Sequence, residues 1–172
     1  MAVPLPFPAL FASHAGIWRA DVDGRVTSLG RGEAMAAAAD TPHILLNAPL
    51  SASRIGYPEL SGLDLLELFA FVHPARFVVP TAAALARLMD LPPPADDAAT
   101  VTMLRAVAAR LLDTLADPGW TARDGAWSGA QALARLRWPW AAAVLARLDP
   151  PATPDRWLFS VLPEWEDAPP RP

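Results

Sequence analysis

The chain has 172 residues, 53% of them hydrophobic, and its 14 basic residues are all arginine. Without lysine it cannot form the lysine-bearing phosphate loop of common ATPases, nor use Schiff-base or lysine-base chemistry. The absence of cysteine excludes disulfides, cysteine-ligated iron–sulfur clusters and thiolate zinc sites. A formal net charge of -4 argues against a protein dedicated to coating nucleic acid, because such proteins are normally basic.

Strand signals occupy the first fifty residues. Segment 11–20 is apolar and β-compatible, Asp23-Gly24 predicts a tight turn, and 25–29 predicts the returning strand of a hairpin. Alanine-rich composition then predicts a helix over 30–39. The apolar run 43–48 predicts a short buried strand.

Helical signals dominate the remainder of the chain. Ser61 and Thr81 are N-cap residue types, and aspartates at the start of the longest helix suit the positive end of the helix dipole. Helices are predicted over 61–73, 81–88, 96–115, 130–136 and 141–148. The longest has an apolar stripe at helical spacing, made of Val101, Leu104, Val107, Ala108, Leu111 and Leu115.

The order of strands and then helices predicts an α/β or α+β domain with a helical C-terminal half. We expect an α/β domain over 1–116, a helical subdomain over 117–160, and a proline-rich acidic tail or linker over 161–172. That tail is expected to continue into another domain. Apolar stretches are too short for a membrane span and the start is a poor export signal, so a cytoplasmic location is expected.

Four segments in order resemble motifs of the DnaQ-type 3′–5′ exonucleases. Leu46 to Ser51 resembles the histidine-asparagine-alanine-x-phenylalanine-aspartate motif, and Leu63 to Leu68 resembles the aspartate-threonine-leucine-glutamate-leucine helix. Leu85 to Leu91 matches the short helix that follows, and Asp96 to Leu104 resembles the last motif. The resemblance implies a ribonuclease H-like α/β fold, with the 43–48 strand beside the opening hairpin and the Asp64 helix packed across the sheet.

The acidic residues of that family are mostly missing. The first Asp-x-Glu pair is absent, Ser51 stands where the second aspartate belongs, and Leu46 replaces the motif's histidine. Only Asp64 and Asp96 correspond, and two carboxylates are too few to hold two metal ions about 3.5–4 Å apart. Both also suit simple helix capping. We therefore expect a degenerate exonuclease domain with no catalytic residues and no metal site.

A second resemblance concerns a longer pattern. Asn47 to Leu50, Tyr57 to Phe71 and Trp127 to Leu148 resemble the N-terminal region of DinG-type ATP-dependent DNA helicases of α-proteobacteria. The resemblance implies an accessory domain whose partner is a helicase motor in the same polypeptide. ATP and magnesium would then be used only by that motor, and this chain would carry no cofactor of its own.

Five residues are candidates for nucleic-acid binding: Asn47, Arg54, Arg76, Arg137 and Trp138. The first three belong to, or flank, the presumed substrate groove, and the other two could contact phosphates and stack on bases. In the structural alternative, the Trp-Pro-Trp corner closes a core between two helices and the arginines are ordinary surface residues.

A different class of function is a stand-alone protein-interaction module with no nucleic-acid role. In that case the exonuclease likeness is accidental and the tryptophans bind another protein. The three histidines are interpreted as structural. Ser51, His73 and Asp64 supply the residue types of a serine-hydrolase triad, but no nucleophile-elbow motif supports that assignment.

Overall fold

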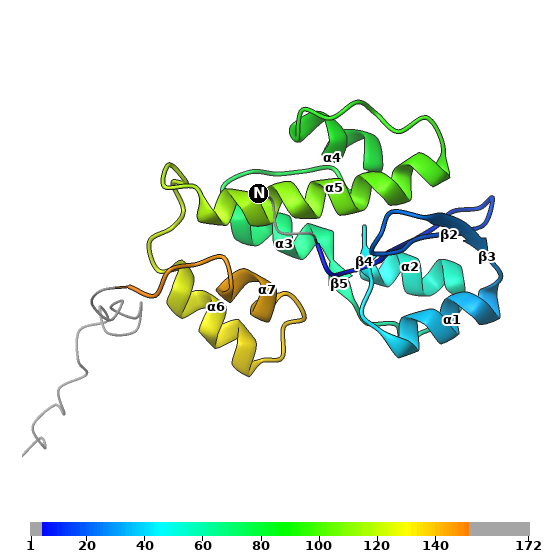
Figure 1. The fold of residues 1–172 in the computed structure, drawn as a ribbon, viewed down its shortest axis with the longest axis horizontal. Helices are drawn as coiled ribbons and strands as arrows, with labels where there is room; N and C mark the ends of the chain where they lie inside the picture. Colours follow the sequence, from blue (N-terminus) through cyan, green and yellow to red (C-terminus); the bar gives the residue numbers. More distant parts are fainter. Residues whose placement is uncertain (1–4, 152–172) are drawn as a thin grey trace, which may run out of the picture. The chain divides into compact units, whose positions relative to one another are not determined.

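The computed structural model describes residues 5–151, which form a mixed α/β structure with a five-stranded sheet (Figure 1). The chain divides into two compact units, Met1–Thr114 and Leu115–Pro172, and the sheet belongs to the first. The predicted tail 161–172 and the end of the predicted helical subdomain lie outside the described residues.

The sheet has the strand order β3-β2-β1-β4-β5. β1 pairs antiparallel with β2 and β2 antiparallel with β3, whereas β4 pairs parallel with both β1 and β5. Ile44 lies opposite Ala9, so the predicted position of the 43–48 segment beside the opening strands is confirmed. The strands are β1 (Ala9–Ala12), β2 (Ile17–Ala20), β3 (Val26–Leu29), β4 (Ile44–Leu45) and β5 (Leu63–Asp64).

Two predicted strands are interrupted or shortened. Segment 11–20 is not one strand, because a turn in which the Ser13 N–H donates to the Gly16 carbonyl at 2.9 Å separates β1 from β2. Segment 43–48 stops early because Asn47 begins a helix, its side-chain oxygen accepting the Leu50 N–H at 3.1 Å. That geometry is the usual N-cap of an asparagine.

The strands pack against two helices, α1 (Arg31–Asp40) and α2 (Ala48–Ile55), which lie on one side of the sheet in Figure 1. Leu10 and Ala12 alternate along β1 and so point to the same face. They share a buried cluster with Ala34 of α1 and Ile55 of α2. Each buried leucine or isoleucine contributes roughly 1.5–3 kcal/mol. The prediction of α1 is confirmed, whereas α2 was not predicted.

The helix predicted over 61–73 is confirmed as α3 (Leu65–Val72), but its expected first turn is extended and contains the strand β5. Gly62 allows the chain to approach β4 closely: a Cβ at this position would lie 2.7 Å from the carbonyl oxygen of His43. The chain is therefore extended here, and the predicted N-cap at Ser61 is wrong. Asp64 caps the helix instead.

The next two helices confirm the sequence prediction. α4 covers Ala82–Leu88, with Thr81 as N-cap, and α5 covers Asp97–Ala116. Burial along α5 follows the predicted apolar stripe, because its six residues are each between 0% and 1% exposed. A periodic stripe on a long helix is the pattern that sequence reading handles best.

Arg105 of α5 holds together backbone segments that are far apart in the sequence. Its guanidinium donates to the carbonyl oxygens of Leu5 at 2.9 Å, Phe7 at 3.0 Å and Val22 at 3.0 Å. A planar guanidinium with five N–H donors is suited to several acceptors at once. One side chain thus fixes the N-terminal segment and the turn between β2 and β3 to the same helix.

The second unit contains two described helices, α6 (Ala126–Arg135) and α7 (Ala141–Leu145). They confirm the two predicted helices with shifted ends. Trp140 is 0% exposed and Trp120 is 6% exposed. At least one ring of the Trp-Pro-Trp corner is therefore part of a core.

α6 ends in a Schellman turn around a non-glycine residue. The Trp138 N–H donates to the Leu133 carbonyl at 2.9 Å, and the Arg137 N–H donates to the Ala134 carbonyl at 3.0 Å. Arg137 has a φ of 62°, in the left-handed region that usually takes glycine at this position. The conformation costs an L-residue roughly 1–2 kcal/mol.

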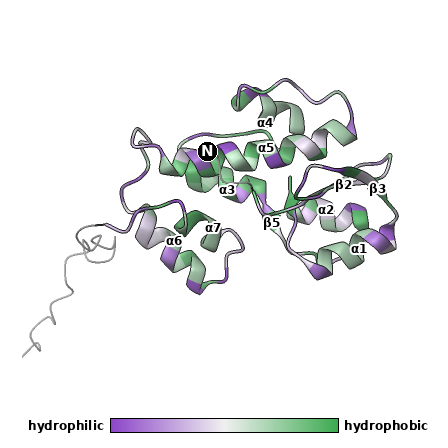
Figure 2. Cartoon of the chain, viewed as in Figure 1, coloured by the Kyte–Doolittle hydropathy of each residue, from purple (hydrophilic) through white to green (hydrophobic). Residues whose placement is uncertain are grey.

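Hydropathy is distributed in short stretches along the described chain (Figure 2). α3 is strongly apolar, with Leu65, Leu68, Phe69 and Val72 buried, but it has only 8 residues. Among residues 5–151, no helix has both the length and the apolar character needed to cross a membrane.

Candidate functional site

Asp64 lies where β5 ends and α3 begins, and its two carboxylate oxygens serve two different helices. Oδ1 accepts the Leu66 N–H at 2.9 Å in α3, and Oδ2 accepts the Ala48 N–H at 2.9 Å in α2. The side chain is only 6% exposed. Burial raises the pKa of this carboxyl group, although the backbone N–H bonds oppose that change. Asp64 therefore ties two helix N-termini together.

The two aspartates at the start of α5 have different roles. Asp96 is a helix cap, since its Oδ1 accepts the Ala99 N–H at 2.7 Å. Asp97 reaches the end of β1, where its Oδ2 accepts the hydroxyl of Ser13 at 2.5 Å. Sequence comparison with the exonuclease motif selected Asp96, but Asp97 is the residue whose side chain contacts the central strand. A capping signal does not distinguish adjacent aspartates.

The histidine-asparagine-alanine-like segment provides structural groups at the start of α2. Asn47 is the N-cap, so its side-chain oxygen is already bonded to a backbone N–H. Ser51, at the place of the family's second aspartate, is buried and donates its hydroxyl to the Asn47 carbonyl at 2.8 Å. Leu46, in place of the histidine, is also buried. These side chains complete the helix start.

The carboxylates do not gather into a metal site among the residues that the structure describes. No group of three or more histidine, cysteine, aspartate or glutamate side chains lies close enough together there to hold a metal ion. The hypothetical triad has local partners as well: Ser51 bonds Asn47, and the ring of His73 lies 5.2 Å from that of Phe69, centroid to centroid.

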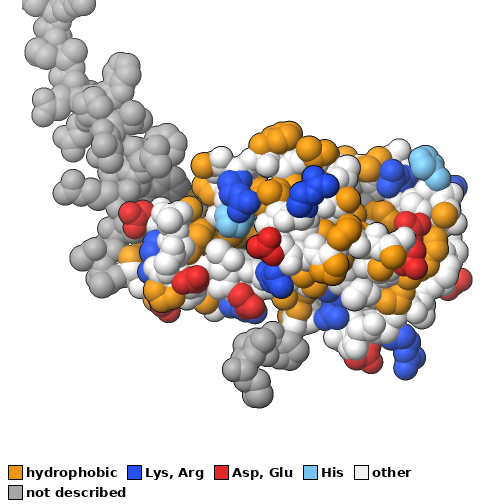
Figure 3. All heavy atoms as spheres, turned by 90° about the horizontal axis from the view of Figure 1, so that it is seen from above, with side chains coloured by type: hydrophobic (Ala, Val, Ile, Leu, Met, Phe, Trp, Pro, Cys, Tyr) orange, Lys and Arg blue, Asp and Glu red, His pale blue; other side chains and the backbone are white. Residues whose placement is uncertain are grey.

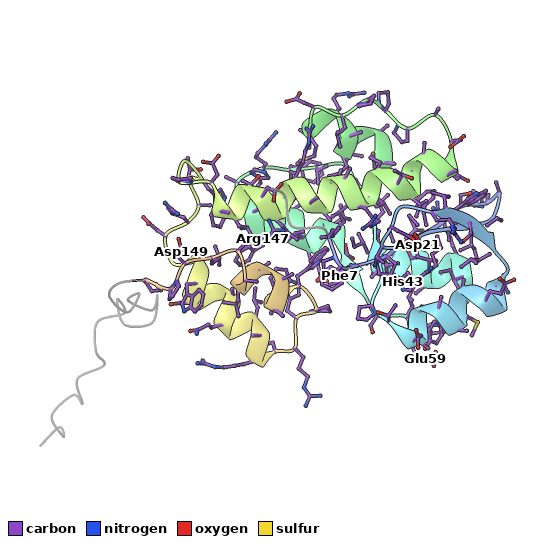
Figure 4. All side chains as sticks on the ribbon, viewed as in Figure 1. Phe7, Asp21, His43, Glu59, Arg147 and Asp149 are labelled. Atoms are coloured by element: carbon purple, nitrogen blue, oxygen red, sulfur yellow. The ribbon has the colours of Figure 1, made fainter. Side chains whose placement is uncertain are left out.

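His43 forms a buried polar link inside the sheet (labelled in Figure 4). Its Nε2 accepts the Nε–H of Arg19 at 2.9 Å, and its Nδ1 lies 2.8 Å from the Thr41 carbonyl oxygen. These partners require a neutral ring that carries its proton on Nδ1. Burial lowers the pKa of His43, and the positive charge of Arg19 acts in the same direction. The structural interpretation of this histidine fits its contacts.

The candidate nucleic-acid residues of the first unit occupy different settings. Arg54 is half-buried, and its Nη1 donates to the Ala12 carbonyl at 2.9 Å, at the end of β1. Arg76 is exposed between α3 and α4, beside Phe77, which is 85% exposed. On the face drawn in Figure 3, arginine side chains are separated by apolar and acidic ones. The described side chains of each unit form no continuous basic band on this face.

Arg137 and Trp138 belong to the second unit, in the turn between α6 and α7. Arg137 is exposed and Trp138 is half-buried. Leu136, directly before them, is 79% exposed. An exposed leucine and an exposed arginine in a strained turn make this corner a surface feature, while Trp140 supplies the buried ring.

A groove in the first unit brings Arg54 together with residues that sequence analysis did not select. It has a volume of about 540 Å³ and is lined by the turn after β1, by Leu29, and by Arg31, Ser53 and Arg54. Arg31 opens α1 and Ser53 lies in α2, so only the tertiary fold places them together. No local motif marks this set, so it cannot be predicted from the sequence.

Comparison with known proteins gives no relative to set beside this geometry. Neither a protein-family model, nor a curated protein, nor a solved structure matches the chain.

Proposed function

We propose that the chain is a catalytically inert domain with ribonuclease H-like strand order, an accessory to an ATP-dependent DNA helicase. It would bind DNA or dock on the helicase motor. The strand order β3-β2-β1-β4-β5, with an antiparallel β1-β2-β3 meander and parallel β4 and β5, supports the proposal, because an exonuclease-like domain needs this arrangement.

The observation that carries the proposal is the hydrogen bond between Ser13 and Asp97. In the exonucleases that the sequence resembles, an acidic pair on the first strand and an aspartate at the last helix share metal ions. Here the end of β1 offers a hydroxyl, which bonds directly to the carboxylate of α5 at 2.5 Å. A neutral hydroxyl bound to a carboxylate supplies one negative charge where a metal pair needs several.

Asp64 supports the same conclusion from the other side. Both of its carboxylate oxygens accept backbone N–H groups, and burial raises its pKa. Turning this carboxylate toward a metal would leave buried N–H groups unpaired, which costs about 1–3 kcal/mol for each group. Asp64 thus stabilises the fold by bonding two helix starts, and this structural role explains why an aspartate occupies the motif position.

The inert state is tested with end-labelled single-stranded DNA and Mg²⁺ or Mn²⁺. We expect no shortening of the strand by the full chain, and a salt-sensitive rise in fluorescence anisotropy when the same DNA is titrated with protein. Degradation that disappears in Asp97→Asn would overturn the inert assignment. Glu59→Gln, an exposed change of the same charge in the first unit, serves as the control.

The stand-alone interaction module is favoured by one different observation. Phe77 is 85% exposed and Val79 is 51% exposed in the segment between α3 and α4. Exposed large apolar groups close together in sequence are typical of a surface that another protein covers. An unchanged anisotropy with DNA at low ionic strength would favour this alternative over the accessory function.

A further inference from the structure

The groove beside the β1–β2 turn has a one-sided charge. Its lining contains the side chains of Arg31 and Arg54 and no aspartate or glutamate. That composition contrasts with the chain as a whole, which has a net charge of -4. A cationic groove on an acidic protein needs a local explanation.

Part of the explanation is the C-terminal end of α2. Arg54 lies in its last turn, and the guanidinium of Arg31 passes close to Gly56, its C-cap: a Cβ there would lie 3.5 Å from Nη1. A helix C-terminus carries about half a negative charge, which attracts cations. Two full positive charges exceed that half charge together with the carboxylate of Asp97, which bonds the lining residue Ser13, so the groove keeps a positive excess.

The two arginines still have hydrogen-bond donors available. One nitrogen of Arg54 is fixed by the Ala12 carbonyl, which orients the guanidinium and leaves its other N–H groups. Arg31 is exposed, so its guanidinium is accessible to a ligand in the groove. Planar guanidinium groups bind phosphate oxygens in pairs of parallel hydrogen bonds. A phosphate is therefore the anion that this pair fits.

The remaining lining sets the size and character of the ligand. Ser53 and His14 add exposed polar groups, while the half-buried Leu29 adds apolar surface. A volume of about 540 Å³ lies within the range of small-molecule sites. It exceeds what a lone phosphate ion needs, which indicates a phosphate attached to a larger, partly apolar group.

We infer that this groove binds the phosphate of a nucleotide, through Arg31 and Arg54. The nucleotide is either free or part of a single strand, and the second source rests on the proposed function. The groove adjoins the Ser13–Asp97 bond, because Ser13 belongs to its lining. A strand bound there would cross the end of β1.

The test uses the full chain and a fluorescent single-stranded oligonucleotide, with adenosine monophosphate and inorganic phosphate as competitors. Arg31→Gln should raise the Kd for the strand about tenfold, the loss of one charge-assisted contact. Arg25→Gln, an exposed arginine outside the groove, removes the same charge and should change Kd less than about twofold. Equal effects of both variants would overturn the inference. Arg25→Gln should keep the wild-type melting temperature, and Arg31→Gln should lower it only slightly, because one favourable contact with the end of α2 is lost.

The outcomes separate this inference from the proposed function. If the strand binds and Arg31→Gln has no effect, the groove assignment is wrong and the accessory function stands. If no strand binds but adenosine monophosphate shifts the amide signals of Ser53 in wild type and not in Arg31→Gln, the groove assignment stands for a free nucleotide, and DNA binding is refuted. If neither probe binds, the inference is wrong and the arginines serve only the end of α2.

Discussion

The Ser13–Asp97 hydrogen bond should be measurable as a coupling free energy within the first unit. A hydrogen bond to a charged group contributes about 1.5–3 kcal/mol, and partial burial places this bond near the lower limit. Ser13→Ala also removes the acceptor of the Ala15 N–H, at 3.0 Å on the surface. We therefore expect Ser13→Ala to lower the free energy of unfolding by about 2 kcal/mol.

A double-mutant cycle with Asp97→Ala isolates the pair. Asp97→Ala alone also loses the favourable interaction of a carboxylate with the start of α5, about 0.3–1 kcal/mol, but that loss cancels in the cycle. We expect a coupling of about 1.5 kcal/mol. Amide hydrogen exchange in β1, β2 and β3 reports on the first unit alone. A coupling under about 0.5 kcal/mol would refute the reasoning, and Ser28→Ala, exposed on β3, should change stability by less than about 0.5 kcal/mol.

Three further predictions concern pH, backbone strain and metal binding. Because burial lowers the pKa of His43, the unfolded chain takes up a proton before the folded chain does as pH falls below 6.5. The free energy of unfolding should therefore decrease below that pH, by at most about 1.4 kcal/mol per pH unit. Urea denaturation should show a flatter pH profile in His43→Gln. A pH profile of His43→Gln identical to wild type would contradict this. Arg137→Gly should raise the free energy of unfolding of the second unit by about 0.5 kcal/mol, because glycine removes the cost of the left-handed conformation but loses more backbone entropy on folding. Arg137→Ala should give no such gain, and thermal melting followed by circular dichroism distinguishes the two variants. Ser13→Asp should place two carboxylates together, lowering the melting temperature without metal and restoring it with Mn²⁺; a melting temperature that does not respond to Mn²⁺ would argue against a nuclease-derived geometry at this position.

Sequence patterns predicted the elements whose signals are local. The Asp23-Gly24 turn joins β2 to β3 as expected, with the Gly24 N–H bonded to the Asp21 carbonyl at 3.1 Å. Thr81 begins α4, and the apolar stripe of α5 is buried. In each case the determining residues are within a few positions of one another, so propensity and periodicity are sufficient.

Other elements are not predicted, either because they depend on tertiary contacts or because their residues also fit another interpretation. β5 has 2 residues and depends on Gly62 approaching the carbonyl of His43, which no local pattern reveals. α2 could have been found: Asn47 followed by Pro49 is an N-cap and first-turn proline signal. The same residues also suit a strand end and the exonuclease-like motif, and these two interpretations compete with the capping signal.

In the candidate site, too, features that depend on residue type are predictable and features that depend on tertiary contacts are not. The absence of most acidic residues from the exonuclease-like positions is visible in the sequence, because it needs only the residue types at those positions. The roles of Asp96 and Asp97 were not, since both suit a helix start and only the fold shows which one meets Ser13. The pairing of Arg31 with Arg54 depends on the contact of α1 with α2, and no spacing predicts it.

The three hydrogen bonds of Arg105 also constrain the order in which contacts can form during synthesis. Leu5 and Phe7 leave the ribosome first, but the side chain that holds their carbonyls is 98 to 100 residues later in the chain. Contacts between such distant residues form late, because a long loop must close before they can be made. The N-terminal segment and the β2–β3 turn can therefore be held in place only after α5 has been translated. A nascent chain stalled before that helix would lack the Arg105 hydrogen bonds to both segments.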